Sequence, residues 1–178
     1  MKHRKHIFFF FIFILFQKSF ACDCEWGGGF FKMASETEII ALVKVTKYLT
    51  FKDIYGKQTP MSMEVEIIDV YKGKETRKTV IIWGDNGFLC RPYLSHFEQG
   101  EYYVIAFYKG SDGSKTEFAH KKERPTDYSI SNCGEYWLKV DIEKQIAIGY
   151  LIERDTQIQI KLTDLKEQLT NIKIINKQ

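Results

Sequence analysis

The chain has 178 residues, of which 44% are hydrophobic and 15% aromatic, with only three prolines. This composition excludes a disordered protein, because disordered chains contain few aromatic and β-branched residues. The formal net charge is +3, but four of the 26 basic residues and none of the 23 acidic residues precede residue 22. The remainder therefore has one more acidic than basic residue, and no basic excess favours nucleic acid as a partner.

The first 21 residues have the three parts of a secretory signal peptide. Three basic residues among the first five precede an apolar run over residues 7–16, and small residues stand at positions 19 and 21. The apolar run is short for a membrane-spanning helix, which needs about 20 residues. We therefore predict a signal peptide over residues 1–21 and a secreted protein, extracellular or periplasmic, that begins at Cys22. An uncleaved anchor is the alternative.

All four cysteines follow the predicted cleavage site, so they would meet an oxidising compartment: Cys22, Cys24, Cys90 and Cys133. We expect two disulfides. A bridge between Cys22 and Cys24 would close a small, strained ring, which leaves two long-range pairings open. A structural zinc site of four thiolates is the alternative, but the paired C-x2-C motifs typical of such sites are missing.

Most of the chain has the composition of β-strands. One run, residues 61–71, alternates between two faces and changes face near Asp69, which predicts a β-bulge or a strong bend. Turn residues separate the runs, and few segments have a helical pattern, which favours a small barrel or sandwich. The predicted strands cover residues 39–48, 61–71, 79–83, 101–108, 137–140, 146–152 and 158–162.

Two short helices are predicted. The first covers residues 30–36, and the second covers residues 163–171, with Thr163 as its cap and with Leu165 and Leu169 on one face. A third segment, residues 111–127, is expected to be an exposed loop, interrupted by one short strand, whose charged side chains are solvated.

No catalytic motif accompanies the two histidines that follow residue 22. His96 and His120 lie in different segments, and we expect each to be a surface residue or a hydrogen-bonded structural residue. The three glycines at 27–29 are too isolated for a phosphate-binding loop, so we expect a flexible or close-packed turn. The sequence predicts no enzymatic activity, no cofactor and no metal of its own.

The order of these features resembles the amino-terminal, netrin-like domain of the tissue inhibitors of metalloproteinases (TIMPs), over about residues 22–137. The features that carry the resemblance are the opening Cys22-Asp23-Cys24, the strand that ends in Val70-Tyr71-Lys72-Gly73, Cys90, the run 97–107 and Cys133.

The resemblance implies a mainly β fold, with an OB-type five-stranded barrel over residues 22–140 and one or two short helices. Residues 141–178 would form a C-terminal extension of strand and helix. The resemblance also implies the bridges Cys22 to Cys90 and Cys24 to Cys133.

In that family the free α-amino group and the first carbonyl of the mature chain bind the catalytic zinc of a protease. The resemblance therefore implies a metalloprotease inhibitor that chelates zinc in trans through Cys22, with Asp23 and Cys24 at the protease pocket. Asp23 departs from the small or apolar residue usual in the family. The alternative is a non-inhibitory netrin-like module that binds an extracellular protein or glycan. No membrane contact is expected unless Cys22 is lipidated, which would anchor the protein.

Overall fold

A computed structural model describes residues 24–113 and 117–175. It is mainly β, with two α-helices and one short 3-10 helix in the described part of the chain. In chain order the elements are α2 (Phe30–Glu36), β1 (Ile39–Ile54), β2 (Lys57–Lys72), β3 (Thr79–Trp83), η1 (Leu94–His96), β4 (Tyr102–Lys109), β5 (Tyr128–Ser129), β6 (Trp137–Asp141), β7 (Ile146–Gly149), β8 (Ile158–Lys161) and α3 (Leu162–Ile175).

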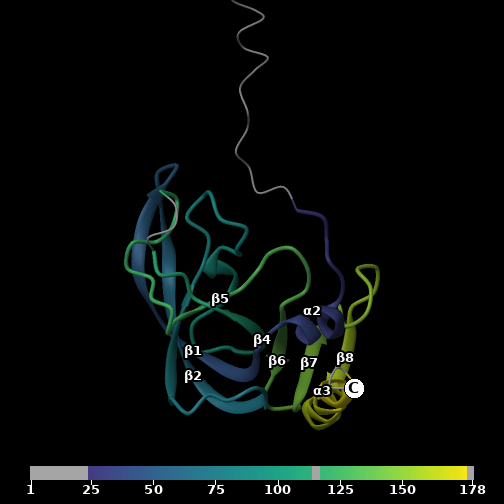
Figure 1. Cartoon of the computed structure of the whole chain (residues 1–178). Helices are drawn as coiled ribbons and strands as arrows, with labels where there is room; N and C mark the ends of the chain where they lie inside the picture. The colour runs from purple at the N-terminus through teal and green to yellow at the C-terminus, as the bar shows by residue number, and fades with distance from the viewer. Residues whose placement is uncertain (1–23, 114–116, 176–178) are drawn as a thin grey trace, which may run out of the picture.

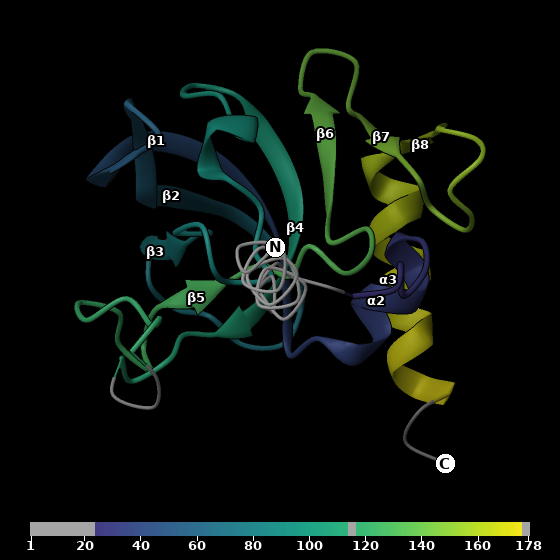
Figure 2. The same ribbon diagram turned by 90° about the horizontal axis from the view of Figure 1, so that it is seen from above.

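Five strands close into a barrel in the order β1-β2-β3-β5-β4, and β4 pairs back with β1. The pairing of β3 with β5 is parallel, and the other pairings around the barrel are antiparallel. Figures 1 and 2 show this barrel from the side and from above. The order is that of an OB-type barrel, so the predicted fold class is confirmed.

The barrel closes at one end of β1, where residues 40–44 pair with both β2 and β4. β1 and β2 are each 16 residues long, and beyond this region they continue as a hairpin toward the turn at residues 55–56. The turn at Tyr55 and Gly56 has φ values of 53° and 80°, the conformation that suits the right-handed twist of a two-residue hairpin. The sequence predicted both strands shorter, because the distal hairpin is mostly exposed and no sustained apolar alternation marks it.

A bulge lies where the sequence predicted a change of face. Leu42 pairs with Asp69 and Val43 pairs with Ile67, so Ile68 is skipped in the ladder. The Ile68 side chain is 45% exposed, although residues of this type are usually buried. The extra residue turns the end of β2 relative to the core, as the sequence pattern indicated.

Three further strands extend the sheet outside the barrel from β4, through β6 and β7 to β8. Helix α3 follows, and its Leu165 and Leu169 are buried in the same hydrophobic cluster as the barrel strands. An ion pair of 2.6 Å joins Lys166 Nζ on α3 to Asp69 Oδ2 on β2. Figure 2 shows α2 beside α3 at this side of the molecule.

The start of the last helix differs from the prediction. Helix α3 begins at Leu162, so Thr163 lies inside its first turn. The Thr163 hydroxyl donates a hydrogen bond to Asp164 Oδ1 at 2.9 Å. Thr163 is therefore not the cap, so that prediction is wrong, whereas the burial of Leu165 and Leu169 on one face is confirmed.

The two-residue strand β5 closes the barrel, and the sequence did not reveal it. A strand was expected within residues 111–127, but the described residues of that loop contain none, and pairing begins at Tyr128. Side chains hold this segment against β3. The Trp83 indole donates to Asp127 Oδ2 at 2.9 Å, and the Tyr128 hydroxyl donates to Glu75 Oε2 at 2.6 Å.

Glu75 should stabilise this closure in a pH-dependent way. Hydrogen bonds from Arg77, above all, lower the Glu75 pKa to about 2 from the ordinary 4.5. A carboxyl whose pKa is lowered by folding contributes stability above its unfolded pKa and loses that contribution as the pH falls toward the folded pKa. We expect Glu75→Gln to lower the free energy of unfolding by about 1–2 kcal/mol at pH 7 and by much less at pH 2.

Urea denaturation of both proteins at the two pH values measures this difference. Glu66→Gln is the matched control, because Glu66 forms a surface ion pair with Lys78, whose side chain is 83% exposed, and such pairs contribute about 0–1 kcal/mol. An equal loss for Glu75→Gln at pH 7 and pH 2 would contradict the account.

Candidate functional site

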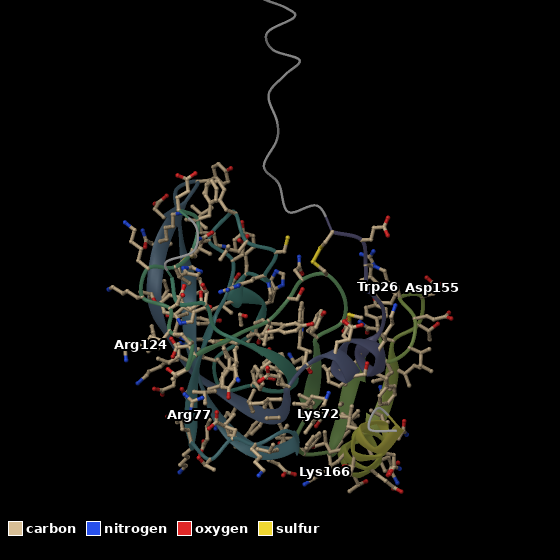
Figure 3. All side chains as sticks on the ribbon, viewed as in Figure 1. Trp26, Lys72, Arg77, Arg124, Asp155 and Lys166 are labelled. Atoms are coloured by element: carbon tan, nitrogen blue, oxygen red, sulfur yellow. A yellow bond between two sulfur atoms is a disulfide. The ribbon has the colours of Figure 1, made fainter. Side chains whose placement is uncertain are left out.

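The described chain begins at a disulfide. Cys24 and Cys133 are bridged across 109 positions, with their Cα atoms 5.6 Å apart. The bridge joins the segment before α2 to the loop before β6. Figure 3 shows the yellow sulfur–sulfur bond near the labelled Trp26. This pairing was implied by the family resemblance, and the structure confirms it.

Cys90 lies beside this bridge. The Sγ atoms of Cys24, Cys90 and Cys133 all lie within 4.8 Å of one another, and none of these cysteines is a free thiol. A backbone hydrogen bond of 3.0 Å from Asn132 N to the Cys90 carbonyl joins the two loops. The expected bridge from Cys90 to Cys22 stays a prediction, because Cys22 and Asp23 lie outside the described residues.

Backbone hydrogen bonds hold the segment that follows Cys24 on both sides. On one side Gly27 N donates to the Cys133 carbonyl at 2.8 Å, and Glu135 N donates to the Gly28 carbonyl at 3.0 Å. On the other side Gly29 N donates to the Ile152 carbonyl at 3.2 Å. The segment therefore lies between the loop before β6 and the loop after β7, while Cys24 and its neighbour Glu25 remain exposed.

The three glycines allow this close backbone packing. A Cβ atom at Gly29 would lie 2.4 Å from the Ile152 carbonyl oxygen, and one at Gly27 would lie 2.8 Å from the Cys133 carbonyl oxygen. Gly28 has a φ of +140°, which side-chain-bearing residues rarely adopt. Of the two expectations for residues 27–29, the close-packed turn is confirmed.

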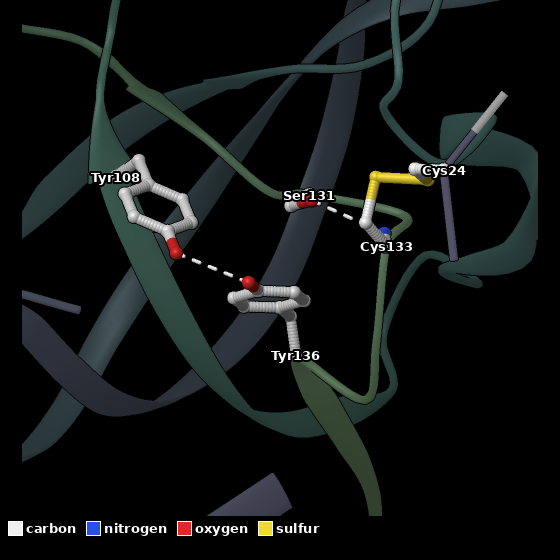
Figure 4. Close-up of a disulfide and its surroundings, with 5 residues drawn as sticks. All are labelled: Cys24, Tyr108, Ser131, Cys133 and Tyr136. Carbon is white, nitrogen blue, oxygen red and sulfur yellow. Dashed lines mark hydrogen bonds between the residues drawn. A yellow bond between two sulfur atoms is a disulfide. The ribbon is translucent and has the colours of Figure 1, made fainter. Parts of the chain in front are cut away.

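The loop that receives the bridge is itself anchored on β4. Figure 4 shows the Tyr108 and Tyr136 hydroxyls in a 3.0 Å hydrogen bond beneath the disulfide. Ser131 Oγ accepts a hydrogen bond of 3.1 Å from Cys133 N, and Ala106 N donates to the Tyr136 carbonyl at 2.8 Å. Burial, the largest cause, raises the pKa of Tyr136, so the hydroxyl stays protonated. These hydrogen bonds fix the loop that carries Cys133 to β4.

A buried ion pair fixes the loop that carries Cys90. Arg91 Nη1 lies 2.9 Å from Glu123 Oε2, with the Arg91 side chain 15% exposed and the Glu123 side chain fully buried. The other carboxylate oxygen of Glu123 accepts a 2.7 Å hydrogen bond from Ser111 N. The expectation that the charges of residues 111–127 are solvated is therefore wrong for Glu123, and it is also wrong for Asp127, which is buried as well. The local sequence does not indicate that Glu123 is buried, because the exposed lysines Lys121 and Lys122 directly precede it.

The two histidines take the structural roles expected of them. His96 is exposed in η1, whereas His120 is buried, and its Nε2 lies 2.8 Å from the Gly84 carbonyl oxygen. Burial, as the largest cause, lowers the His120 pKa, which favours the neutral ring.

In the described ranges the three cysteines are the one cluster with metal-ligand spacing, and the Cys24–Cys133 bridge removes the thiolates that zinc would need.

Comparison of the sequence with family models and with curated proteins finds no match. The structure has no helix, within its described ranges, that is both long and apolar enough to cross a membrane. Neither comparison bears on the resemblance to the metalloprotease inhibitors, which stays an expectation from the sequence.

Gly29→Ala tests how closely the amino-terminal segment is packed. The added methyl group would meet the Ile152 backbone, which cannot move without disturbing the loop after β7. We expect the free energy of unfolding to fall by about 1–3 kcal/mol, the cost of overpacking a rigid site. Chemical denaturation of the oxidised protein measures it.

The matched control is Gly56→Asn at the hairpin turn. Gly56 has open space around its Cβ position and a φ of +80°, which asparagine tolerates better than most residues. This variant should lose less than about 1 kcal/mol. A Gly29→Ala protein as stable as the control would show that the segment is loosely held.

Proposed function

We propose that this protein is a secreted inhibitor of zinc metalloproteases that acts through the free amino terminus of Cys22. The observation that carries the proposal is the way in which residues 24–29 are held. A disulfide and backbone hydrogen bonds on two sides fix the segment, yet Cys24 and Glu25 are exposed at the surface. A chain end that begins two residues earlier would start from a rigid, accessible position.

Chelation of the protease zinc requires that one residue, Cys22, supply two ligands. A catalytic zinc is held by three protein ligands and keeps a position for water. In the proposed complex the Cys22 α-amino nitrogen and carbonyl oxygen replace that water. The amine binds in its unprotonated form, and an α-amino pKa of about 8 leaves that form accessible near neutral pH.

Rigidity contributes to affinity in this mechanism. Association costs free energy for every side chain and loop that becomes ordered at the interface, and a segment that is already ordered avoids that cost. The Cys24–Cys133 bridge and the close-packed glycines supply this order next to the reactive end. The predicted Cys22–Cys90 bridge would extend it to the first residue of the mature chain.

Asp23 should decide which proteases are targets. A carboxylate in an apolar specificity pocket loses its hydration and approaches the catalytic glutamate of such proteases with like charge. We therefore infer that the targets have a cationic or polar pocket.

Two changes at the amino terminus test the mechanism. One extra alanine before Cys22, or acetylation of its amine, removes the zinc ligand and should abolish inhibition. Asp23→Thr should strengthen inhibition of a protease with an apolar pocket by about 1–3 kcal/mol, because an unpaired charge no longer enters that pocket. Inhibition constants against a panel of zinc metalloproteases give both results.

Intact mass and terminal sequencing of the exported protein must first establish that Cys22 is the free, unlipidated first residue. The extended protein and Asp23→Thr should both melt at the wild-type temperature, because neither changes a residue of the barrel strands. Inhibition that survives a blocked amine would refute the chelation mechanism. If neither the wild-type protein nor Asp23→Thr inhibits any protease, the protein is better described as a netrin-like binding module for an extracellular protein or glycan.

A further inference from the structure

We propose that the end of the barrel that carries Cys24 binds anionic membrane surfaces. The proposal concerns one patch, here called the tip surface, which does not include the amino-terminal segment. It is formed by the distal β1–β2 hairpin, the loop after β3 and the loop between β4 and β5. Its members are Phe51, Lys52, Tyr55, Lys57, Phe88, Phe118, Lys121 and Lys122.

Large apolar side chains are exposed on all three segments. Tyr55 at the hairpin turn is fully exposed, and the exposed fractions of Phe51, Phe88 and Phe118 are 52%, 51% and 37%. Exposed aromatic clusters on a folded protein mark interaction sites, because single exposed side chains are common but contiguous ones are not. Aromatic rings are also the side chains that prefer the boundary between membrane and water.

Direct contacts join the three segments into one surface. Lys52 Nζ on the hairpin donates to the Asn86 carbonyl at 3.1 Å and lies 5.5 Å from the centre of the Phe88 ring. The Phe88 and Phe118 rings are 5.0 Å apart, and Asn86 Nδ2 donates to the Phe118 carbonyl at 2.6 Å. Phe88 and Phe118 are thus held in place before any partner binds.

The same end of the molecule has an apolar hollow that Phe51 and Tyr55 border. It has a volume of about 450 Å³ and lies between the distal hairpin and residues 93–95. Lys57 is the one charged side chain among the described residues that line it, and its aromatic lining comes from Tyr48, Phe51, Tyr55 and Tyr93. A hydrophobic hollow beside a single cation suits the boundary between an anionic headgroup and acyl chains.

Charge favours an anionic partner at this end. The tip surface includes four lysines, and within the described ranges Lys57, Lys121 and Lys122 form no ion pair with a carboxylate. Acids also lie at this end: Asp53 accepts a 2.8 Å hydrogen bond from Gly56 N within the turn, and the exposed Glu117 lies beside Phe118. The four lysines outnumber these two carboxylates. Lysines near a membrane surface are attracted by anionic lipids, and this attraction weakens as salt is added.

Single-stranded nucleic acid is the competing partner, since OB-type barrels also bind it across the second and third strands and the adjoining loops. Here Glu64 and Glu66 on β2 are already paired with lysines, at 3.5 Å from Lys47 and 3.4 Å from Lys78. A polyanion that follows β2 would have to compete with these carboxylates for the lysines, whereas a flat membrane that touches only the tip surface would not. Figure 1 shows the hairpin turn and the beginning of the described chain at the same, upper end.

Vesicle binding by the mature protein tests the proposal. We expect sedimentation with phosphatidylcholine vesicles that contain about one quarter phosphatidylserine, little binding to pure phosphatidylcholine, and weaker binding in 0.5 M salt. The double variant Phe51→Ser/Tyr55→Ser should bind at least about 10-fold more weakly. Lys121→Gln/Lys122→Gln should weaken binding and reduce its dependence on salt.

Ile68→Ser is the matched control, because Ile68 is also exposed but lies at the bulge, far along β2 from the turn. It should bind vesicles like the wild-type protein, and circular dichroism should show all variants folded. The proposal is overturned if the folded wild-type protein binds no anionic vesicles at low salt, if the double variant binds normally, or if a single-stranded oligonucleotide binds while vesicles do not. Protease inhibition without vesicles should not change in these variants, so this test is independent of the proposed inhibitor function.

Discussion

The Cys24–Cys133 disulfide is the interaction on which the arrangement of this molecule depends. The two cysteines are 109 positions apart, and the loop that the bridge closes contains all five strands of the barrel. By the chain-entropy account, a bridge over such a loop stabilises the fold by about 4–5 kcal/mol. The same short segment also hydrogen-bonds to the loops before β6 and after β7, so the barrel and the three outer strands meet at residues 24–29.

The sequence predicted those strands of the barrel whose buried side chains form a recognisable apolar pattern along the chain. Strand β3 was predicted with its observed bounds, and the bulge at Ile68 was visible as a change of face near Asp69. The outer half of the hairpin was missed because it packs against few neighbours, so no apolar alternation marks it. Strand β5 was missed because two residues are too short for any period, and its place is decided by Trp83 and Glu75, which are distant in the chain.

The candidate site was predictable only in part. Four cysteines in a chain that is predicted to be exported indicate disulfides, and the family resemblance supplied the observed pairing of Cys24. The buried Arg91–Glu123 pair could not be predicted, because Glu123 follows two exposed lysines in a segment that looks like an ordinary surface loop. An OB-type barrel serves many functions, so the proposed inhibition depends on Cys22 and Asp23 and not on the fold.

The central claim is that the amino-terminal segment is held rigidly against the barrel while its end stays exposed. Amide hydrogen exchange of the oxidised protein, read at single residues, tests this most directly. The account predicts that the amides of Gly27, Gly29 and Glu135 exchange nearly as slowly as those of the barrel core, because each is hydrogen-bonded across two segments. Exchange of these three amides at the rate of an unfolded peptide, with the core still protected, would contradict it.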